Sequence, residues 1–123
     1  MTDTPRAGDG DIPVTIDGED FVLTPTFEAA KALLGREGGL VEMVRRVGTL
    51  DLNAVSEVIA HGLGYGMTKR PPKDLPQRIW RTGITDESGL TEKCIEYLHT
   101  LANGGRRPPD PNKEQEGPTQ TGS

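Results

Sequence analysis

Apolar and polar residues alternate on both sides of an Asp-Gly pair near the start of the chain, at Asp17 and Gly18. This pair tolerates the positive φ angles of a two-residue type I′ turn, so the stretch predicts a β-hairpin. The turn also fixes the register, because residues at equal distance from it lie opposite one another. Thr15 and Asp20 then point to water. The opposite face collects the apolar residues Ile12, Val14, Phe21 and Leu23.

After the hairpin, the apolar residues change to the spacing of amphipathic helices. Helices are expected at about 27–36, 40–47, 52–63 and 75–82, and from 86–88 to 103. The candidate N-caps are Thr24 or Thr26 for the first helix, Asp51 or Asn53 for the third, and Asp74 for the fourth. The first helix is expected to turn Phe27, Ala30 and Leu34 inward. The predicted fold class is α+β and predominantly helical, with an N-terminal hairpin packed on about five short helices.

Both ends of the 123-residue chain lack the large apolar side chains that a core needs. Segment 1–11 is polar, and segment 104–123 contains no Leu, Ile, Val, Phe or Trp. Neither can bury enough apolar surface to offset the entropy lost on ordering. The sequence therefore predicts a disordered N-terminus at 1–11, one hairpin-plus-helices domain at 12–103, and a disordered polar tail at 104–123.

The formal net charge of −5 is unevenly distributed along the chain. Residues 1–20 carry six acids against one arginine, whereas residues 69–81 carry five bases against one acid. Such runs are most often solvated surface, but they can also steer a charged partner. The chain is therefore dipolar rather than basic.

Residues that could support catalysis or metal binding are few and scattered. The one cysteine, Cys94, excludes an internal disulfide and a multi-cysteine zinc site, and it falls on an apolar helix stripe. His61 and His99 are interpreted as surface or half-buried structural residues rather than as metal ligands. The glycine-rich segment 62–66 follows a helix, whereas phosphate-binding loops follow a strand. We therefore expect no catalysis, no cofactor and no metal.

The sequence also shows no feature of a secreted or membrane protein. The first residues lack the basic and apolar regions of a signal peptide. No apolar run approaches the roughly 20 residues needed to span a bilayer. We therefore expect a soluble cytoplasmic protein with no membrane partner.

The basic run at 69–81 contains the only tryptophan, Trp80. Nucleic-acid binding would use such a run, but the pI near 5.0 and the Pro71-Pro72 break argue against it. An aromatic residue beside two arginines has the composition of an interface anchor, and the alternative is that Trp80 covers the core. The predicted partner-binding site, bordered by Lys73, comprises Leu75, Arg78, Ile79, Trp80 and Arg81.

The organising motifs of the chain also carry a family resemblance. A short hairpin is followed by a Pro-Thr-Phe helix entry at 25–27, a Gly-Gly-Leu break at 38–40, and the stretch LDLNAVSEVIAHGL at 50–63. With these motifs the chain resembles the small protein encoded beside the tail genes of gene transfer agents, a family that belongs with the phage tail assembly chaperones. The resemblance covers about 14–103, and its motifs are hydrophobic patterns.

The resemblance implies a morphogenesis factor for a siphophage-like tail, working in the cytoplasm of a bacterial host cell. It would hold the tape-measure protein soluble while tail-tube subunits polymerise around it. The implied partners are the tape-measure protein, the tail-tube protein or both, and copies of the chain could associate with one another. The chain departs from the family pattern at 69–73 and after Gly104, where it is longer and more charged.

Two alternatives stay open at this point. The first is a structural tail or tail-tube component that stays associated with the tail, although a tube subunit normally needs a β-rich sandwich or barrel. The second is a small acidic regulator or a nucleic-acid-binding adaptor. The three hypotheses differ in what the surface around Trp80 would contact.

Overall fold

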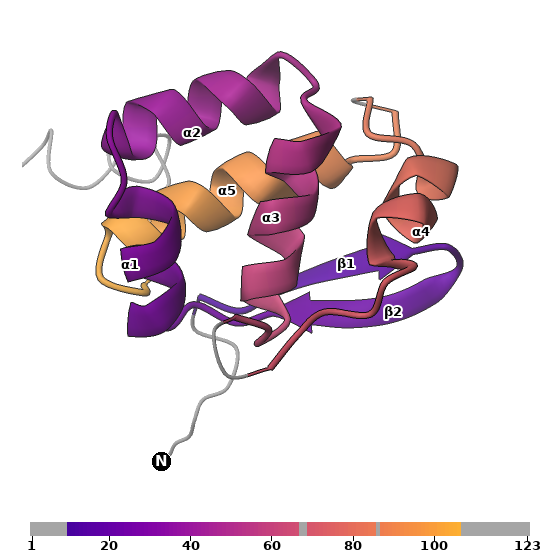
Figure 1. Cartoon of the computed structure of the whole chain (residues 1–123), viewed down its shortest axis with the longest axis horizontal. Coiled ribbons are helices and arrows are strands. Elements are labelled where there is room, and N and C mark those ends of the chain that lie inside the picture. The colour runs from indigo at the N-terminus through magenta and orange to yellow at the C-terminus, as the bar shows by residue number, and fades with distance from the viewer. Residues whose placement is uncertain (1–9, 67–68, 86, 107–123) are drawn as a thin grey trace, which may run out of the picture.

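A computed structural model describes residues 10–66, 69–85 and 87–106, and it shows a hairpin followed by five helices (Figure 1). The hairpin consists of strands β1 (Ile12–Ile16) and β2 (Glu19–Leu23). The helices are α1 (Phe27–Leu34), α2 (Gly39–Gly48), α3 (Leu52–Gly62), α4 (Leu75–Thr82) and α5 (Leu90–Ala102). This arrangement confirms the predicted α+β, predominantly helical fold.

The hairpin has the register that its turn predicts. Asp17 and Gly18 adopt φ angles of 55° and 81°, and β1 pairs antiparallel with β2 so that Ile12 lies opposite Leu23. Ile12 and Leu23 are buried, as expected for the inward face. Phe21 differs from the expectation, because it is only partly buried and the Arg78 guanidinium lies 5.7 Å from its ring centroid. The Phe21 ring is therefore covered in part by the Arg78 side chain of α4.

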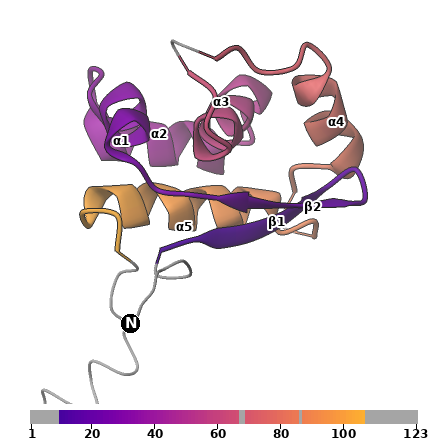
Figure 2. The same cartoon turned by 90° about the horizontal axis from the view of Figure 1, so that it is seen from below.

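Helices α3, α4 and α5 pack on the hairpin, and α1 and α2 pack on α3 and α5 (Figures 1 and 2). Helix α5 is central to this arrangement. It packs on α1, α2, α3 and β1. Tyr97, a core residue that the helix pattern did not reveal, is fully buried, and its hydroxyl donates a hydrogen bond to the Thr24 carbonyl oxygen at 2.8 Å. This bond links α5 to the end of β2. The other buried apolar side chains of α5 are Leu90, Cys94, Leu98 and Leu101.

The buried face of α1 differs from the expected one. Phe27 is 72% exposed, and the buried side chains of α1 are Ala29 and Leu33. The sequence FEAAKALL is apolar on more than one side, so the pattern alone cannot select the face that α2, α3 and α5 cover. The helix also ends at Leu34 instead of Arg36, and the Arg36 side chain donates two hydrogen bonds to Glu57, each 3.1 Å long.

Two of the three expected N-caps form. The Thr26 hydroxyl accepts a hydrogen bond from the Ala29 N–H at 3.0 Å. The Asp51 carboxylate accepts from the Asn53 N–H at 2.9 Å. The expected Asp74 cap is wrong, because its side chain makes no capping bond to α4.

Helix α3 approaches β2 closely because Gly62 has no side chain. A Cβ atom at Gly62 would lie 2.8 Å from Leu23 Cδ2, which is closer than packed atoms allow. The Gly62 carbonyl oxygen accepts a hydrogen bond from the Thr24 N–H at 2.9 Å. The glycine that the sequence places in a glycine-rich segment therefore has a packing role at the junction of β2 and α3.

The expected disordered segments, 1–11 and 104–123, fall mostly outside the described residues. Among those described, the Gly104 and Gly105 N–H groups bond to carbonyl oxygens in the last turn of α5. Gly10 lies against Gly105, since a Cβ atom at Gly10 would be 2.3 Å from the Gly105 carbonyl oxygen. The two ends of the described chain therefore meet. Within the described parts, no helix combines the length and apolar character needed to cross a membrane.

Replacing Leu23 by alanine tests this arrangement of the hairpin. The Leu23 side chain is fully buried between β2 and α3, so its loss should lower the free energy of unfolding by about 2–5 kcal/mol. Phe21→Ala should cost less, because that ring is partly exposed. Urea denaturation of both variants measures the difference. A larger loss for Phe21→Ala than for Leu23→Ala would contradict the observed inward face.

Candidate protein-binding surface

Helix α4 is a short element whose ends are set by proline and glycine. The Leu75 N–H bonds to the Pro72 carbonyl oxygen at 3.1 Å, which begins the turn that leads into the helix. Pro76 occupies the first turn, where its missing N–H costs no hydrogen bond. Gly83 ends the helix with a φ of 93°, and its N–H bonds to the Ile79 carbonyl oxygen at 3.1 Å.

The two faces of α4 divide the predicted partner-binding residues into two groups. Leu75 and Ile79 are buried in the core, where α4 packs on α3 and β1, so neither can contact a partner directly. Trp80 is 65% exposed, and Arg81 also lies at the surface. Trp80 therefore does not cover the core, and the exposed part of the predicted site is narrower than the sequence suggested.

The turn of the hairpin holds α4 through five residues, which we call the turn cluster: Asp17, Glu19, Arg78, Arg81 and Thr82. The Asp17 carboxylate pairs with Arg81 at 2.7 Å, and Glu19 pairs with Arg78 at 2.8 Å. The Asp17 N–H also donates to the Thr82 hydroxyl at 2.6 Å. The hydrogen bond from Arg81 holds the pKa of Asp17 below its usual range, and burial opposes this effect.

The turn cluster explains the uneven charge of the sequence. Acids from the N-terminal run and bases from the 69–81 run meet across the hairpin turn and α4. Two of the five bases in that run, Arg78 and Arg81, are therefore already paired within the chain. Sequence reasoning missed these contacts because more than 50 residues separate the partners.

The remaining cations lie in the segment that leads to α4, which we call the basic connector: Lys69, Arg70, Pro71, Pro72 and Lys73. The Lys69 ammonium lies 5.3 Å from the centroid of the Tyr65 ring. Arg70 and Lys73 are exposed, and within the described part of the chain neither has a carboxylate at ion-pair distance. Lys73 lies in the turn that leads into α4, the helix that carries Trp80.

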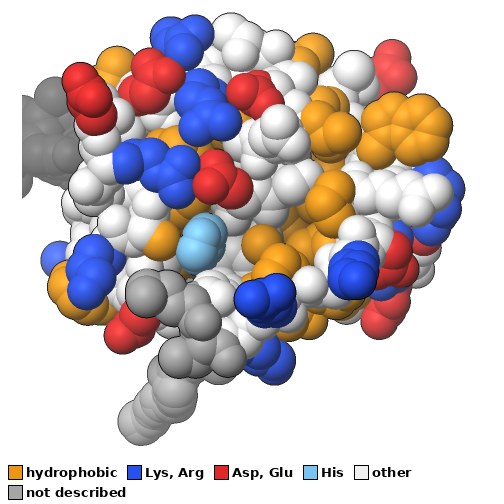
Figure 3. Space-filling model, viewed as in Figure 1, with side chains coloured by type: hydrophobic (Ala, Val, Ile, Leu, Met, Phe, Trp, Pro, Cys, Tyr) orange, Lys and Arg blue, Asp and Glu red, His pale blue; other side chains and the backbone are white. Residues whose placement is uncertain are grey.

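Figure 3 shows hydrophobic side chains over α4 and in the strip between α3 and α4, with Lys and Arg side chains along the lower border of that strip. On these two helices, Leu52 and Ala60 are partly buried, and Trp80 is the most exposed large apolar residue. We use the term α4 surface for Trp80, Lys73 and the exposed residues Pro76 and Gln77 between them. This surface is shallow and combines one large aromatic residue with uncompensated positive charge.

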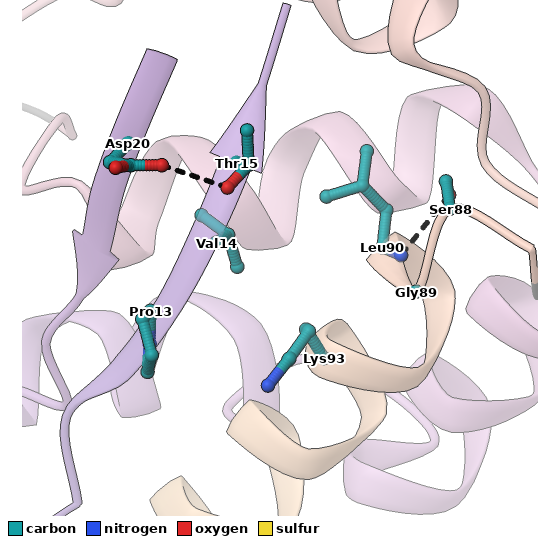
Figure 4. Close-up of a pocket in the computed structure, with 8 residues that line it drawn as sticks. All are labelled: Pro13, Val14, Thr15, Asp20, Ser88, Gly89, Leu90 and Lys93. Carbon is teal, nitrogen blue, oxygen red and sulfur yellow. Dashed lines mark hydrogen bonds between the residues drawn. The ribbon is translucent and has the colours of Figure 1, made fainter. Parts of the chain in front are cut away.

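A concave region lies between β1 and the first turns of α5 and has a volume of about 400 Å³ (Figure 4). Pro13 and Thr15 line it from β1, and Lys93 lines it from α5. This region is poorly suited to acid–base chemistry, because the one carboxylate in its lining, Asp20, is already engaged by a hydrogen bond from the Thr15 hydroxyl at 2.9 Å. The strand edge is also a weak docking site, since Pro13 has no N–H and the Asp17 N–H is already bonded.

The cysteine and the two histidines lie in different environments. Cys94 is buried, and burial raises the pKa of its thiol to about 12, so the thiol is neutral at physiological pH. Burial also lowers the pKa of His61, while His99 is exposed. Among the described residues, no three His, Cys, Asp or Glu side chains come together as a metal-binding group.

A hollow of about 450 Å³ lies beside the corner between α2 and α3 and is lined by Gly48, Leu50, Thr85 and Glu87. Leu50 has a φ of 65° and is 43% exposed, but its neighbours bring no convergent polar groups.

No family model, curated protein or solved structure matches this chain. The α4 surface is therefore interpreted from its own residues.

Asp17→Asn tests whether the turn cluster holds α4. Asparagine keeps the tolerance for positive φ but removes the charge that pairs with Arg81 and Arg78, so the melting temperature should fall at neutral pH. Because folding lowers the pKa of Asp17, its stabilising effect is present above the ordinary aspartate pKa of 3.8 and is lost as pH falls through the lower pKa of the folded state. The difference in melting temperature between wild type and variant should therefore shrink in acid.

Asp20→Asn is the matched control for this experiment. Asp20 is exposed on the same hairpin, and the partner of its side chain is the Thr15 hydroxyl. Differential scanning calorimetry at neutral pH should show only a small change in melting temperature for this variant. Equal changes for Asp17→Asn and Asp20→Asn would contradict the role of the turn cluster.

Proposed function

We propose that this protein is a non-catalytic assembly factor for a phage-like tail, which binds the tape-measure protein and keeps it soluble while the tail tube forms. The observation that carries the proposal is the exposure of Trp80 on a helix that the turn cluster holds in place. The assignment to tail assembly comes from the family resemblance of the 14–103 region. The proposed site of action is the cytoplasm of the bacterial host cell.

An exposed tryptophan supports a protein-binding role. Tryptophan and arginine are enriched among the residues that dominate the energetics of protein interfaces. Trp80 leaves 65% of its surface in water, which is unfavourable unless a partner covers it. Leu75 and Ile79 anchor the opposite face of α4 in the core, so the helix can present Trp80 without rearranging.

The form of the surface supports reversible binding of an elongated partner. A shallow apolar surface with charged residues at its border is typical of protein contacts, whereas small-molecule sites are enclosed and lined by convergent polar groups. The two hollows near α5 and the α2–α3 corner lack that arrangement. A chaperone needs contact that can be released when tube subunits arrive, and a small exposed surface suits that requirement.

The two alternatives receive less support. A tail-tube component needs a β-rich ring, and the described residues form one two-stranded sheet. A nucleic-acid adaptor needs a large set of free cations, but the pairing of Arg78 and Arg81 with Asp17 and Glu19 leaves only three of the five bases in the 69–81 run without an acidic partner among the described residues. We therefore favour the chaperone role over both.

Co-expression with the tape-measure protein from the same genome tests the proposal. The wild-type chain should keep the tape-measure protein in the soluble fraction and co-purify with it. Trp80→Ala combined with Lys73→Glu should weaken the complex by about 30-fold, which corresponds to the loss of one interface hot spot of about 2 kcal/mol. Arg78 is left unchanged, because Arg78→Glu would break its pair with Glu19 and disturb the fold.

The matched control is Phe27→Ala combined with Lys31→Glu. Phe27 is 72% exposed, the Lys31 ammonium lies 5.8 Å from its ring centroid, and α1 lies at the other end of the molecule from α4 (Figures 1 and 2). This variant should keep the tape-measure protein soluble. If both double variants fold and both solubilise the partner, the α4 surface is not the binding site. If the wild-type chain assembles by itself into tubes, the chaperone role is wrong.

A further inference from the structure

We infer that the partner segment docked on the α4 surface is an amphipathic helix whose apolar stripe is flanked by acidic residues. This inference rests on the proposed function and gives the chemistry of the partner at the same site. It follows from the charge that the fold leaves unpaired, from the main-chain bonding of α4, and from the position of the exposed side chains.

The unpaired charge beside Trp80 is positive. The turn cluster uses Asp17 and Glu19 to neutralise Arg78 and Arg81, so these groups add little net charge to the surface. Arg70 and Lys73 have no ion-pair partner within the described residues, and Asp74 is the single acid of the 69–81 run. A partner that covers Trp80 therefore meets a positive border, and acidic side chains complement it.

The same charge argues against a second copy of this chain as the occupant. A symmetric contact between two α4 surfaces would place the basic connector of one copy against that of the other. Like charges brought together at an interface oppose association. The acids that could compensate, Asp17 and Glu19, are already held in the turn cluster.

A helix fits this surface better than an extended strand. The N–H groups of Arg78 and Gly83 bond to carbonyl oxygens one turn earlier in the helix, so α4 offers side chains to a partner instead of a free strand edge. Lys73 lies in the turn just before the first residue of α4, so the basic connector borders the N-terminal end of that helix. A partner helix carries side chains along its whole length, so one apolar residue can meet Trp80 while an acid nearer the N-terminal end of α4 meets Lys73.

The strip between α3 and α4 gives this helix a place to lie. Figure 3 shows hydrophobic side chains along that strip, bordered by Lys and Arg. Helices α3 and α4 pack against one another, so the strip lies over two helices that are already held together. A preformed surface loses little conformational entropy on binding.

Fluorescence of the full chain tests the inference directly, because Trp80 is the only tryptophan and it belongs to the surface itself. The probe is a synthetic peptide of about 20 residues, roughly 30 Å of helix, with a leucine stripe flanked by glutamates and with no tryptophan. The comparison peptide carries lysine at every glutamate position. The acidic peptide should shift the Trp80 emission to shorter wavelength in a saturable way, and the basic peptide should bind at least about 10-fold more weakly.

Charge reversal on the protein should move this preference. Arg70→Glu combined with Lys73→Glu should weaken binding of the acidic peptide by about 10-fold or more and should strengthen binding of the basic peptide. Lys31→Glu makes a charge reversal on α1, far from α4, and should leave both affinities unchanged. Equal binding of the two peptides, or no emission shift with the acidic one, would overturn the inference.

The outcome separates this inference from the proposed function. If the acidic peptide binds with the stated charge dependence but the chain does not solubilise the tape-measure protein, the surface chemistry is supported and the assembly role fails. If the tape-measure protein is solubilised through Trp80 but the acidic peptide does not bind, the assembly role is supported and the inferred partner chemistry is wrong.

Discussion

The side of α4 that faces water depends on the burial of Leu75 and Ile79 in the core and on the contacts between this helix and the turn of the hairpin. Asp17 bonds to α4 through both its carboxylate and its main-chain N–H, and Glu19 adds a third ion pair to the two that Asp17 makes. Exposed ion pairs contribute little to stability one at a time, so their value here is geometric. Ile79 fills the core on the inner side of α4, and the turn cluster fixes the rotation that leaves Trp80 outside. The proposed binding surface depends on this arrangement.

The same contacts give the surface its charge. Pairing within the chain removes two arginines from the basic run and leaves the basic connector as the positive region beside Trp80. A chain with a net charge of −5 thus presents a local positive border next to its largest exposed aromatic residue. This combination is the basis of the proposed binding surface, and it shows that the net charge of the chain does not describe the charge of this surface.

Features set by neighbouring residues could be predicted from the sequence, and features set by distant contacts could not. The Asp17-Gly18 turn fixed the register of the hairpin, and Thr26 and Asp51 were correctly placed as caps because capping acts within one helical turn. The inward face of α1 and the buried position of Tyr97 depend on packing across the whole domain. In the candidate site, Trp80 and Arg81 are accessible as expected, while the predicted contacts Leu75 and Ile79 belong to the core. An eight-residue helix with apolar residues on two sides does not reveal which side is buried.

Hydrogen exchange of the complex with the tape-measure protein, followed by mass spectrometry, tests the central claim most directly. If the turn cluster orients α4 as a binding surface, partner binding should slow exchange in the peptides that cover the basic connector and α4. Exchange in α1, around the exposed Phe27, should not change. Protection confined to α1 or to the strands of the hairpin, with α4 unaffected, would contradict the account.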